Sequence, residues 1–205
     1  MKFKELNLPN KLTVLRLFAV PLCVLAVMLP EKWVPAAVSA IIALVIFIAA
    51  SLTDMLDGKI ARKYNLITDF GKFLDPLADK FMVIGTMLAI VCRNGFIRPW
   101  FFWVVLIVIF REFAVTSLRL IASTSGGVVV AAAWLGKVKT TVQMITVCAA
   151  LLEPVIYAGI SGTAGEWLQR FPPLTCIASL LTAYFTIVSG IDYIRQLWKY
   201  LDAEK

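Results

Sequence analysis

Long apolar stretches alternate with short polar ones along the whole 205-residue chain. Six of them are long and apolar enough to cross a bilayer core, which takes about 20 helical residues. They lie near 12–29, 35–56, 74–92, 99–121, 134–157 and 174–197. Continuous apolar runs of this length favour helices, because membrane strands would show short alternating segments. The pattern predicts an all-α integral membrane protein, a bundle of six transmembrane helices forming a single domain over residues 1–205.

The connections and the N-terminal segment complete this prediction. Breaks that contain Gly or Pro, including the one at 159–173, are predicted to be short connections. The opening "MKFKELNLPNKLTVLRLFAVP" carries basic residues both before and inside the first apolar stretch. We expect this segment to lie partly along the membrane interface, with Lys11 and Arg16 among the lipid headgroups.

Composition and charge agree with a membrane location and indicate an orientation. The chain is 60% hydrophobic and 16% charged, whereas soluble domains are about 45–50% apolar and about 25% charged. Of the 20 Lys and Arg residues, all but Lys32, Arg93, Arg98 and Arg170 fall on or near the side of the two termini. The positive-inside rule makes that side cytoplasmic, in a cell (cytoplasmic) membrane. A net charge of +7 suits anionic headgroups or a phosphorylated substrate. Nucleic acid is not an expected partner, because the basic residues are scattered among the spans.

A group of carboxylates interrupts the apolar pattern in "SLTDMLDGKIARKYNLITDFGKFLDPLADK", residues 51–80. On a helix, residues three and four apart share a face. Two such stripes are present, one with Asp54, Asp57, Gly58 and Ala61 and the other with Gly71, Asp75 and Asp79. The polar turn between them lets the two helices run antiparallel, so four carboxylates could converge near the cytoplasmic boundary. Asp69 breaks the spacing, and we interpret it as a solvated loop residue.

Four converging carboxylates require a cation, because like charges repel strongly near a bilayer. The chain contains no His, and oxygen ligands without His or Cys select hard ions such as Mg²⁺ or Mn²⁺. Four carboxylates can hold two such ions, an arrangement that clamps a transferring phosphoryl group. Gly58 and Ala61 would leave room for a bulky ligand. The alternatives are solvated acids paired with nearby Lys and Arg, a carboxylate-based cation transporter, and a prenyl-diphosphate enzyme.

Read as a pattern, residues 54–79 are D-x2-D-G-x2-A-R-x8-G-x3-D-x3-D, which resembles the signature of the CDP-alcohol phosphatidyltransferase family. All eight fixed positions match: Asp54, Asp57, Gly58, Ala61, Arg62, Gly71, Asp75 and Asp79. The resemblance implies six transmembrane helices, a homodimer and a site with divalent metal that faces the cytoplasm. It also implies transfer of a phosphatidyl group from CDP-diacylglycerol to an alcohol, with release of CMP.

The resemblance also implies a role for each matching residue. Asp54, Asp57, Asp75 and Asp79 would bind the metal ions, and Asp79 would be the base that takes the proton of the attacking hydroxyl. The residues implied in binding the CDP-lipid are Asp54, Gly58, Ala61, Arg62 and Gly71. With no His available, a carboxylate is also the best candidate for the base on chemical grounds.

Basic residues in two further stretches, "FREFAVTSLRLIA" and "WLGKVKTTVQM", bear on the identity of the alcohol. Arg111, Arg119, Lys137 and Lys139 fall at the cytoplasmic ends of the fourth and fifth expected helices. Each alone is typical of an interfacial anchor, but together they predict a pocket for a dianionic phosphate. These stretches and the N-terminal "NLPNKLTVLRL" resemble family members whose acceptor is sn-glycerol 3-phosphate. A phosphorylated inositol would require a similar pocket for its phosphate and is the alternative acceptor.

Overall fold

The computed structural model describes residues 7–64, 68–95, 97–126, 134–160 and 162–198. Within its helices the side chains of Leu8, Asp57, Lys59, Ala61, Arg62, Asp69, Phe70, Lys72, 122–126 and Leu197 lie outside the description. The described residues form helices and connections without a strand. The helices are α1 (Leu8–Met28), α2 (Ala36–Lys63), α3 (Asp69–Arg93), α4 (Arg98–Gly126), α5 (Trp134–Tyr157), α6 (Thr163–Arg170) and α7 (Pro173–Leu197).

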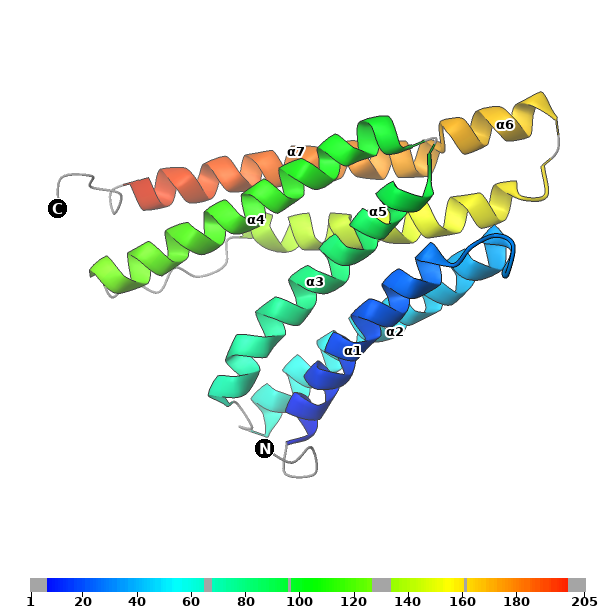
Figure 1. Ribbon diagram of the computed structural model, residues 1–205. Coiled ribbons are helices and arrows are strands. Elements are labelled where there is room, and N and C mark those ends of the chain that lie inside the picture. The colour runs from blue at the N-terminus through cyan, green and yellow to red at the C-terminus, as the bar shows by residue number, and fades with distance from the viewer. Residues whose placement is uncertain (1–6, 65–67, 96, 127–133, 161, 199–205) are drawn as a thin grey trace.

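The helices are arranged in two groups (Figure 1). Helices α1, α2 and α3 run alongside one another, while α4, α5 and α7 form the second group. Helix α2 packs on α5, and α3 packs on both α4 and α5. From the connection between them, α3 and α4 diverge toward the opposite end of the bundle. The start of α1, the end of α2 and the start of α3 lie together at that end, and α4 and α7 also end on the side away from the connection.

The core between the groups consists of apolar side chains of all sizes. Cys23, Ala43, Met87, Phe101 and Val147 belong to it and have no exposed surface. Many large apolar side chains are instead exposed on the outer helix faces, listed from α1 to α7 as Phe18, Leu25, Val45, Phe81, Trp103, Phe110, Ile156 and Leu180. So much exposed apolar surface is incompatible with water but is what contact with lipid requires.

Among the described residues, five stretches are long and apolar enough to cross a membrane, namely Pro9–Met28, Ala36–Leu56, Arg98–Ile121, Trp134–Tyr157 and Thr163–Gln196. The chain is therefore an all-helical, multi-pass membrane protein. Helix α3 covers the predicted span 74–92, but Asp75, Asp79, Lys80 and Arg93 interrupt its apolar sequence. The composition of α3 alone does not qualify it as a sixth span. A total of six transmembrane helices therefore stays a prediction.

Two details differ from the sequence prediction. The region 159–173, expected to be a connection, contains the eight-residue helix α6. In addition, Arg16 is only 2% exposed, so its predicted place among lipid headgroups is wrong. Its guanidinium lies inside the bundle because carboxylates of α2 and α3 pair with it, as described below.

Candidate active site

Helix α1 presents three polar side chains to the carboxylate motif. Asn10, Thr13 and Arg16 are spaced by three residues, so they share one helix face. All three are buried, with 5%, 2% and 2% of their surface exposed. Buried polar groups need partners, and these three find them in and next to α2 and α3. The N-terminal helix therefore forms one wall of the candidate site.

Arg16 joins the two carboxylate stripes. Its Nη1 donates to Asp54 Oδ1 at 2.6 Å and to Asp79 Oδ1 at 3.4 Å. Asp54 belongs to α2 and Asp79 to α3, so one guanidinium links three helices. The structure thus places two of the predicted metal ligands, one from each stripe, on the same guanidinium.

A second set of contacts fixes the start of α3. Thr13 Oγ1 donates to Asp75 Oδ1 at 2.7 Å, which orients the third carboxylate. Thr68 caps the helix by accepting from Gly71 N at 3.1 Å, and Asn10 Nδ2 donates to Thr68 Oγ1 at 2.9 Å. A Cβ at position 71 would lie 2.9 Å from Asn10 Oδ1. A side chain at position 71 would therefore displace the Asn10 side-chain amide, which donates to Thr68.

The remaining motif positions are less fully described. Gly58 lies one turn after Asp54 on α2 and is partly exposed. The side chains of Asp57, Ala61 and Arg62 lie outside the described residues, so their predicted metal and CDP-lipid contacts stay predictions. The same holds for Asp69, whose side chain is not described and whose backbone begins α3 rather than lying in a loop.

The described carboxylates suit a hard divalent ion by their chemistry. Their donors are oxygens alone, and they already face a positive charge, the Arg16 guanidinium. No three Asp, Glu, His or Cys side chains approach closely enough to hold a metal ion within the described part of the chain. The fourth ligand of the predicted set, Asp57, is outside that part. The donor type thus fits Mg²⁺ or Mn²⁺, whereas the Arg16 guanidinium offsets part of the negative charge that would attract the ion.

A second cluster, which we call the basic cluster, contains Lys80, Arg111, Glu112 and Lys139. Arg111 Nη1 lies 3.1 Å from Glu112 Oε1, and Lys139 Nζ donates to the same oxygen. Lys80 Nζ lies 3.8 Å from Glu112 Oε2. Three cations on α3, α4 and α5 thus surround one carboxylate. Because Lys80 directly follows Asp79, helix α3 connects the basic cluster to the carboxylates.

Tyr193 of α7 extends this cluster to Arg119. Its hydroxyl accepts a hydrogen bond from Arg119 Nη2, and its ring lies 4.7 Å from the Arg119 Cζ and 5.4 Å from the Arg111 Cζ. A Cβ at Gly190 would lie 3.2 Å from Arg111 Cγ, so a small residue there lets α7 approach α4. The face of an aromatic ring attracts cations. Tyr193 therefore keeps the Arg111 and Arg119 guanidinium groups close to its ring.

Three of the four predicted acceptor-binding residues are thus brought together. Lys137, the fourth, is exposed one turn after the start of α5. Its backbone carbonyl accepts from Thr140 and Thr141, but its side chain has no described contact with the cluster. The sequence prediction did not include Lys80, Tyr193, Thr13 or Asn10 as site residues. The only sequence signal for them was polarity within or beside apolar stretches.

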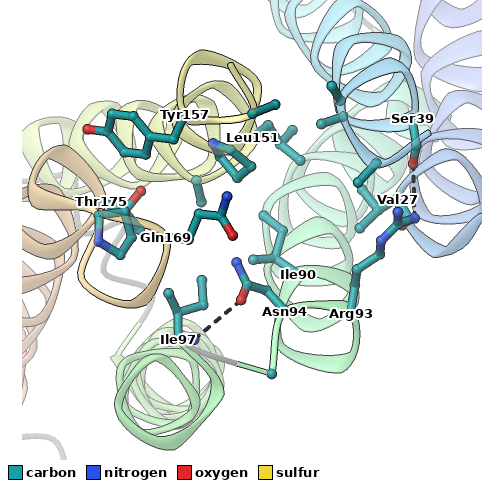
Figure 2. Close-up of a pocket in the computed structure, with 18 of the residues that line it drawn as sticks. Val27, Ser39, Ile90, Arg93, Asn94, Ile97, Leu151, Tyr157, Gln169 and Thr175 are labelled. Atoms are coloured by element: carbon teal, nitrogen blue, oxygen red, sulfur yellow. Dashed lines mark hydrogen bonds between the residues drawn. The ribbon is translucent and has the colours of Figure 1, made fainter. Parts of the chain in front are cut away.

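A cavity of about 300 Å³ lies at the other end of the bundle, away from the motif (Figure 2). Arg93, Asn94, Tyr157, Gln169 and Thr175 line it together with apolar side chains. Arg93 Nη1 donates to Val27 O at 2.7 Å and to Ser39 Oγ at 3.0 Å. The motif carboxylates are absent from its lining, so the cavity is not the candidate active site.

Comparison with known proteins points to one family. The family model described as CDP-alcohol phosphatidyltransferase matches residues 6–188. A protein of Bacillus subtilis (strain 168) named CDP-diacylglycerol–glycerol-3-phosphate 3-phosphatidyltransferase is 39% identical over 204 residues. The match covers 95% of this chain and 97% of that protein. A protein of the same name from Escherichia coli (strain K12) is 38% identical over 164 residues, covering 78% of this chain and 85% of its own.

Proposed function

Because this chain belongs to the CDP-alcohol phosphatidyltransferase family, we propose that it transfers the phosphatidyl group of CDP-diacylglycerol to sn-glycerol 3-phosphate. The products are phosphatidylglycerol phosphate and CMP. The observation that supports this acceptor is the basic cluster, which puts three cations beside the carboxylate motif. The acceptor is also the one named for relatives that are 38–39% identical.

In this proposal the carboxylates hold the metal ions that make the phosphatidyl phosphorus of the donor easier to attack. Asp54, Asp57, Asp75 and Asp79 would hold two Mg²⁺ or Mn²⁺ ions, which when bound neutralise charge on the diphosphate. Thr13 and Arg16 keep Asp75, Asp54 and Asp79 in place from the side of α1. Gly58, Ala61, Arg62 and Gly71 would surround the nucleotide part of the donor.

The base and the acceptor site complete the reaction. Asp79 would take the proton of the acceptor hydroxyl, whose oxygen forms a bond to the phosphatidyl phosphorus. The bond from that phosphorus to CMP breaks, and CMP leaves with the electron pair. Arg111, Arg119, Lys137 and Lys139 would bind the phosphate of the acceptor, because guanidinium and ammonium groups form strong charge-assisted hydrogen bonds with it. Lys80 would also bind this phosphate, because it lies in the basic cluster next to Glu112.

We further propose that α3 spans the bilayer as a sixth transmembrane helix, after an N-terminal segment that lies at the interface. The carboxylate motif and the basic cluster would then face the cytoplasm of a cell membrane. Charged residues of α3 have polar partners on neighbouring helices, Asp75 and Asp79 on α1 and Lys80 on α4, which supports their placement inside a helical bundle. A homodimer surrounded by membrane lipids is the assembly we expect.

The purified protein tests this function directly. CDP-diacylglycerol and a panel of acceptors (glycerol 3-phosphate, inositol phosphate, glycerol and serine) are supplied with Mg²⁺ or Mn²⁺, and CMP and the lipid product are measured. We expect release of CMP with glycerol 3-phosphate, its loss in excess EDTA and its return with added metal. Full activity in EDTA would contradict the metal proposal, and faster use of inositol phosphate would replace the acceptor.

A further inference from the structure

Arg16 lies on the inner side of the carboxylate pair that it joins. It is 2% exposed, whereas the side chains of Asp54 and Asp79 are 33% and 47% exposed. The guanidinium therefore holds these carboxylates from the interior, and each carboxylate also reaches the surface of the candidate site. Neither the motif nor the expected metal chemistry uses this arginine.

The charge of Arg16 matters most when no metal is bound. Asp54 and Asp79 come from different helices, and their negative charges oppose the close packing of α2 and α3. A positive charge 2.6 Å and 3.4 Å from their oxygens offsets that repulsion. Without Arg16 these two partly exposed carboxylates would face each other uncompensated, which would destabilise the packing of α2 against α3.

We propose that Arg16 is a resident counterion, which stabilises the metal-free carboxylate site and thereby weakens metal binding to it. This inference rests on the divalent metal site proposed above. Arg16 and a metal ion would both interact with the carboxylates of Asp54 and Asp79. The interaction of each with these carboxylates is therefore less favourable when the other is present. Such a coupling is reciprocal by thermodynamic necessity. Arg16 is thus a positioning residue that sets the affinity of the site for metal.

The test measures folding and metal binding in full-length Arg16→Gln, purified in detergent. In EDTA its unfolding temperature should fall by about 10 °C relative to wild type. In saturating Mn²⁺ the loss should be less than half as large, because the metal replaces the missing charge. Titration followed by electron paramagnetic resonance should give an Mn²⁺ Kd at least about tenfold lower than that of wild type, since one nearby charge shifts cation binding on this scale.

Two variants serve as controls. Arg16→Lys keeps the charge, so its Mn²⁺ Kd should stay within a few-fold of wild type. Arg93→Gln removes an arginine bonded to Val27 O and Ser39 Oγ at the other end of α3, and should lower the unfolding temperature equally with and without Mn²⁺.

Each contrary outcome is decisive. An Arg16→Gln protein with unchanged or weaker Mn²⁺ binding would overturn the inference, as would one that fails to fold even with Mn²⁺. If that happened while wild type bound Mn²⁺, the proposed metal site would stand and only the role of Arg16 would fall. Wild type that binds no Mn²⁺ would overturn both.

Discussion

At the scale of single residues, the motif carboxylates could be predicted from the sequence but their partners could not. Helical spacing places Asp75 and Asp79 on one face of a helix, whatever the fold. Arg16 and Asp54, in contrast, are 38 residues apart, and Arg16 and Asp79 are 63 apart. Only the packing of α1 against α2 and α3 brings them together, so the sequence alone suggested lipid headgroups for Arg16.

Asp79 is the residue whose loss should affect the chemistry most. Asp79→Asn removes the proposed base together with a ligand charge, and we expect CMP release to fall by about 10²–10⁴-fold, the usual contribution of general base catalysis. A suitable control is Asp192→Asn on α7, where the carboxylate accepts from Gln196 Nε2 at 2.9 Å. Its activity should stay within a few-fold of wild type. Equal losses in both variants would contradict the assignment of Asp79.

Substitution of Arg119 should weaken use of the acceptor and leave binding of the donor unchanged. A hydrogen bond to a charged group is worth roughly 1.5–3 kcal/mol, so Arg119→Gln should reduce kcat/KM for glycerol 3-phosphate by about ten- to a hundredfold. The KM for CDP-diacylglycerol should change little. Arg195→Gln, an exposed arginine in the last turn of α7, is the control and should alter neither. Unchanged acceptor kinetics in Arg119→Gln would leave Arg119 as an interfacial anchor.

At the scale of helices, length and hydrophobicity predicted six of the seven helices that the described residues form, with ends that differ by up to seven residues. Helix α6 was missed because its sequence, TAGEWLQR, is short and polar, with no apolar run to mark it. The start of α7 also depends on a contact that no local pattern shows. Glu153 of α5 is 1% exposed and accepts from Leu174 N at 2.8 Å and from Thr175 N at 2.6 Å. An acid in an apolar stretch therefore has a structural role here.

Glu153 should contribute to stability without contributing to catalysis. In Glu153→Leu the backbone N–H groups at the start of α7 lose their acceptor, and the attraction of a carboxylate to a helix N-terminus is lost as well. We expect a loss of about 2–4 kcal/mol in the free energy of unfolding, measured by denaturant titration in detergent. Glu166→Leu, on exposed α6, should change it by less than about 0.5 kcal/mol.

Glutamine at position 153 refines this test. Glu153→Gln keeps one acceptor oxygen but not the charge, so its stability should lie between those of wild type and Glu153→Leu. The kcat of the folded Glu153 variants should match wild type, since the residue lies at the end of the bundle away from the motif. A large loss of kcat in a stable variant would contradict the structural role.

At the scale of the whole molecule, the sequence predicted a multi-pass helical bundle because lipid-facing helices are apolar over their full length. The number of spans is harder to predict, since α3 carries the charges of the candidate site. Its charged residues Asp75, Asp79 and Lys80 lower its mean hydropathy, although most of its buried side chains are apolar. Polar side chains of α1 pair with Asp75 and Asp79, and a hydropathy pattern does not take these contacts into account.

The location of the termini distinguishes six spans from five. If α3 crosses the bilayer, both termini lie on the cytoplasmic side, where the basic residues are concentrated. Green fluorescent protein fused to either end should then fluoresce in bacterial cells, and alkaline phosphatase fused to either end should be inactive. Termini on opposite sides would show that α3 does not span.

The burial of Arg16 also has a consequence for the order of events during synthesis. The arginine lies in the first span, Pro9–Met28, and leaves the ribosome well before Asp54 and Asp79. An arginine near the middle of a helix opposes insertion by about 2.5–3.5 kcal/mol. Until α2 has been made, α1 lacks Asp54, and until α3 has been made it also lacks Asp79. We therefore expect α1 to be stable in the bilayer only once α2 and α3 have packed against it.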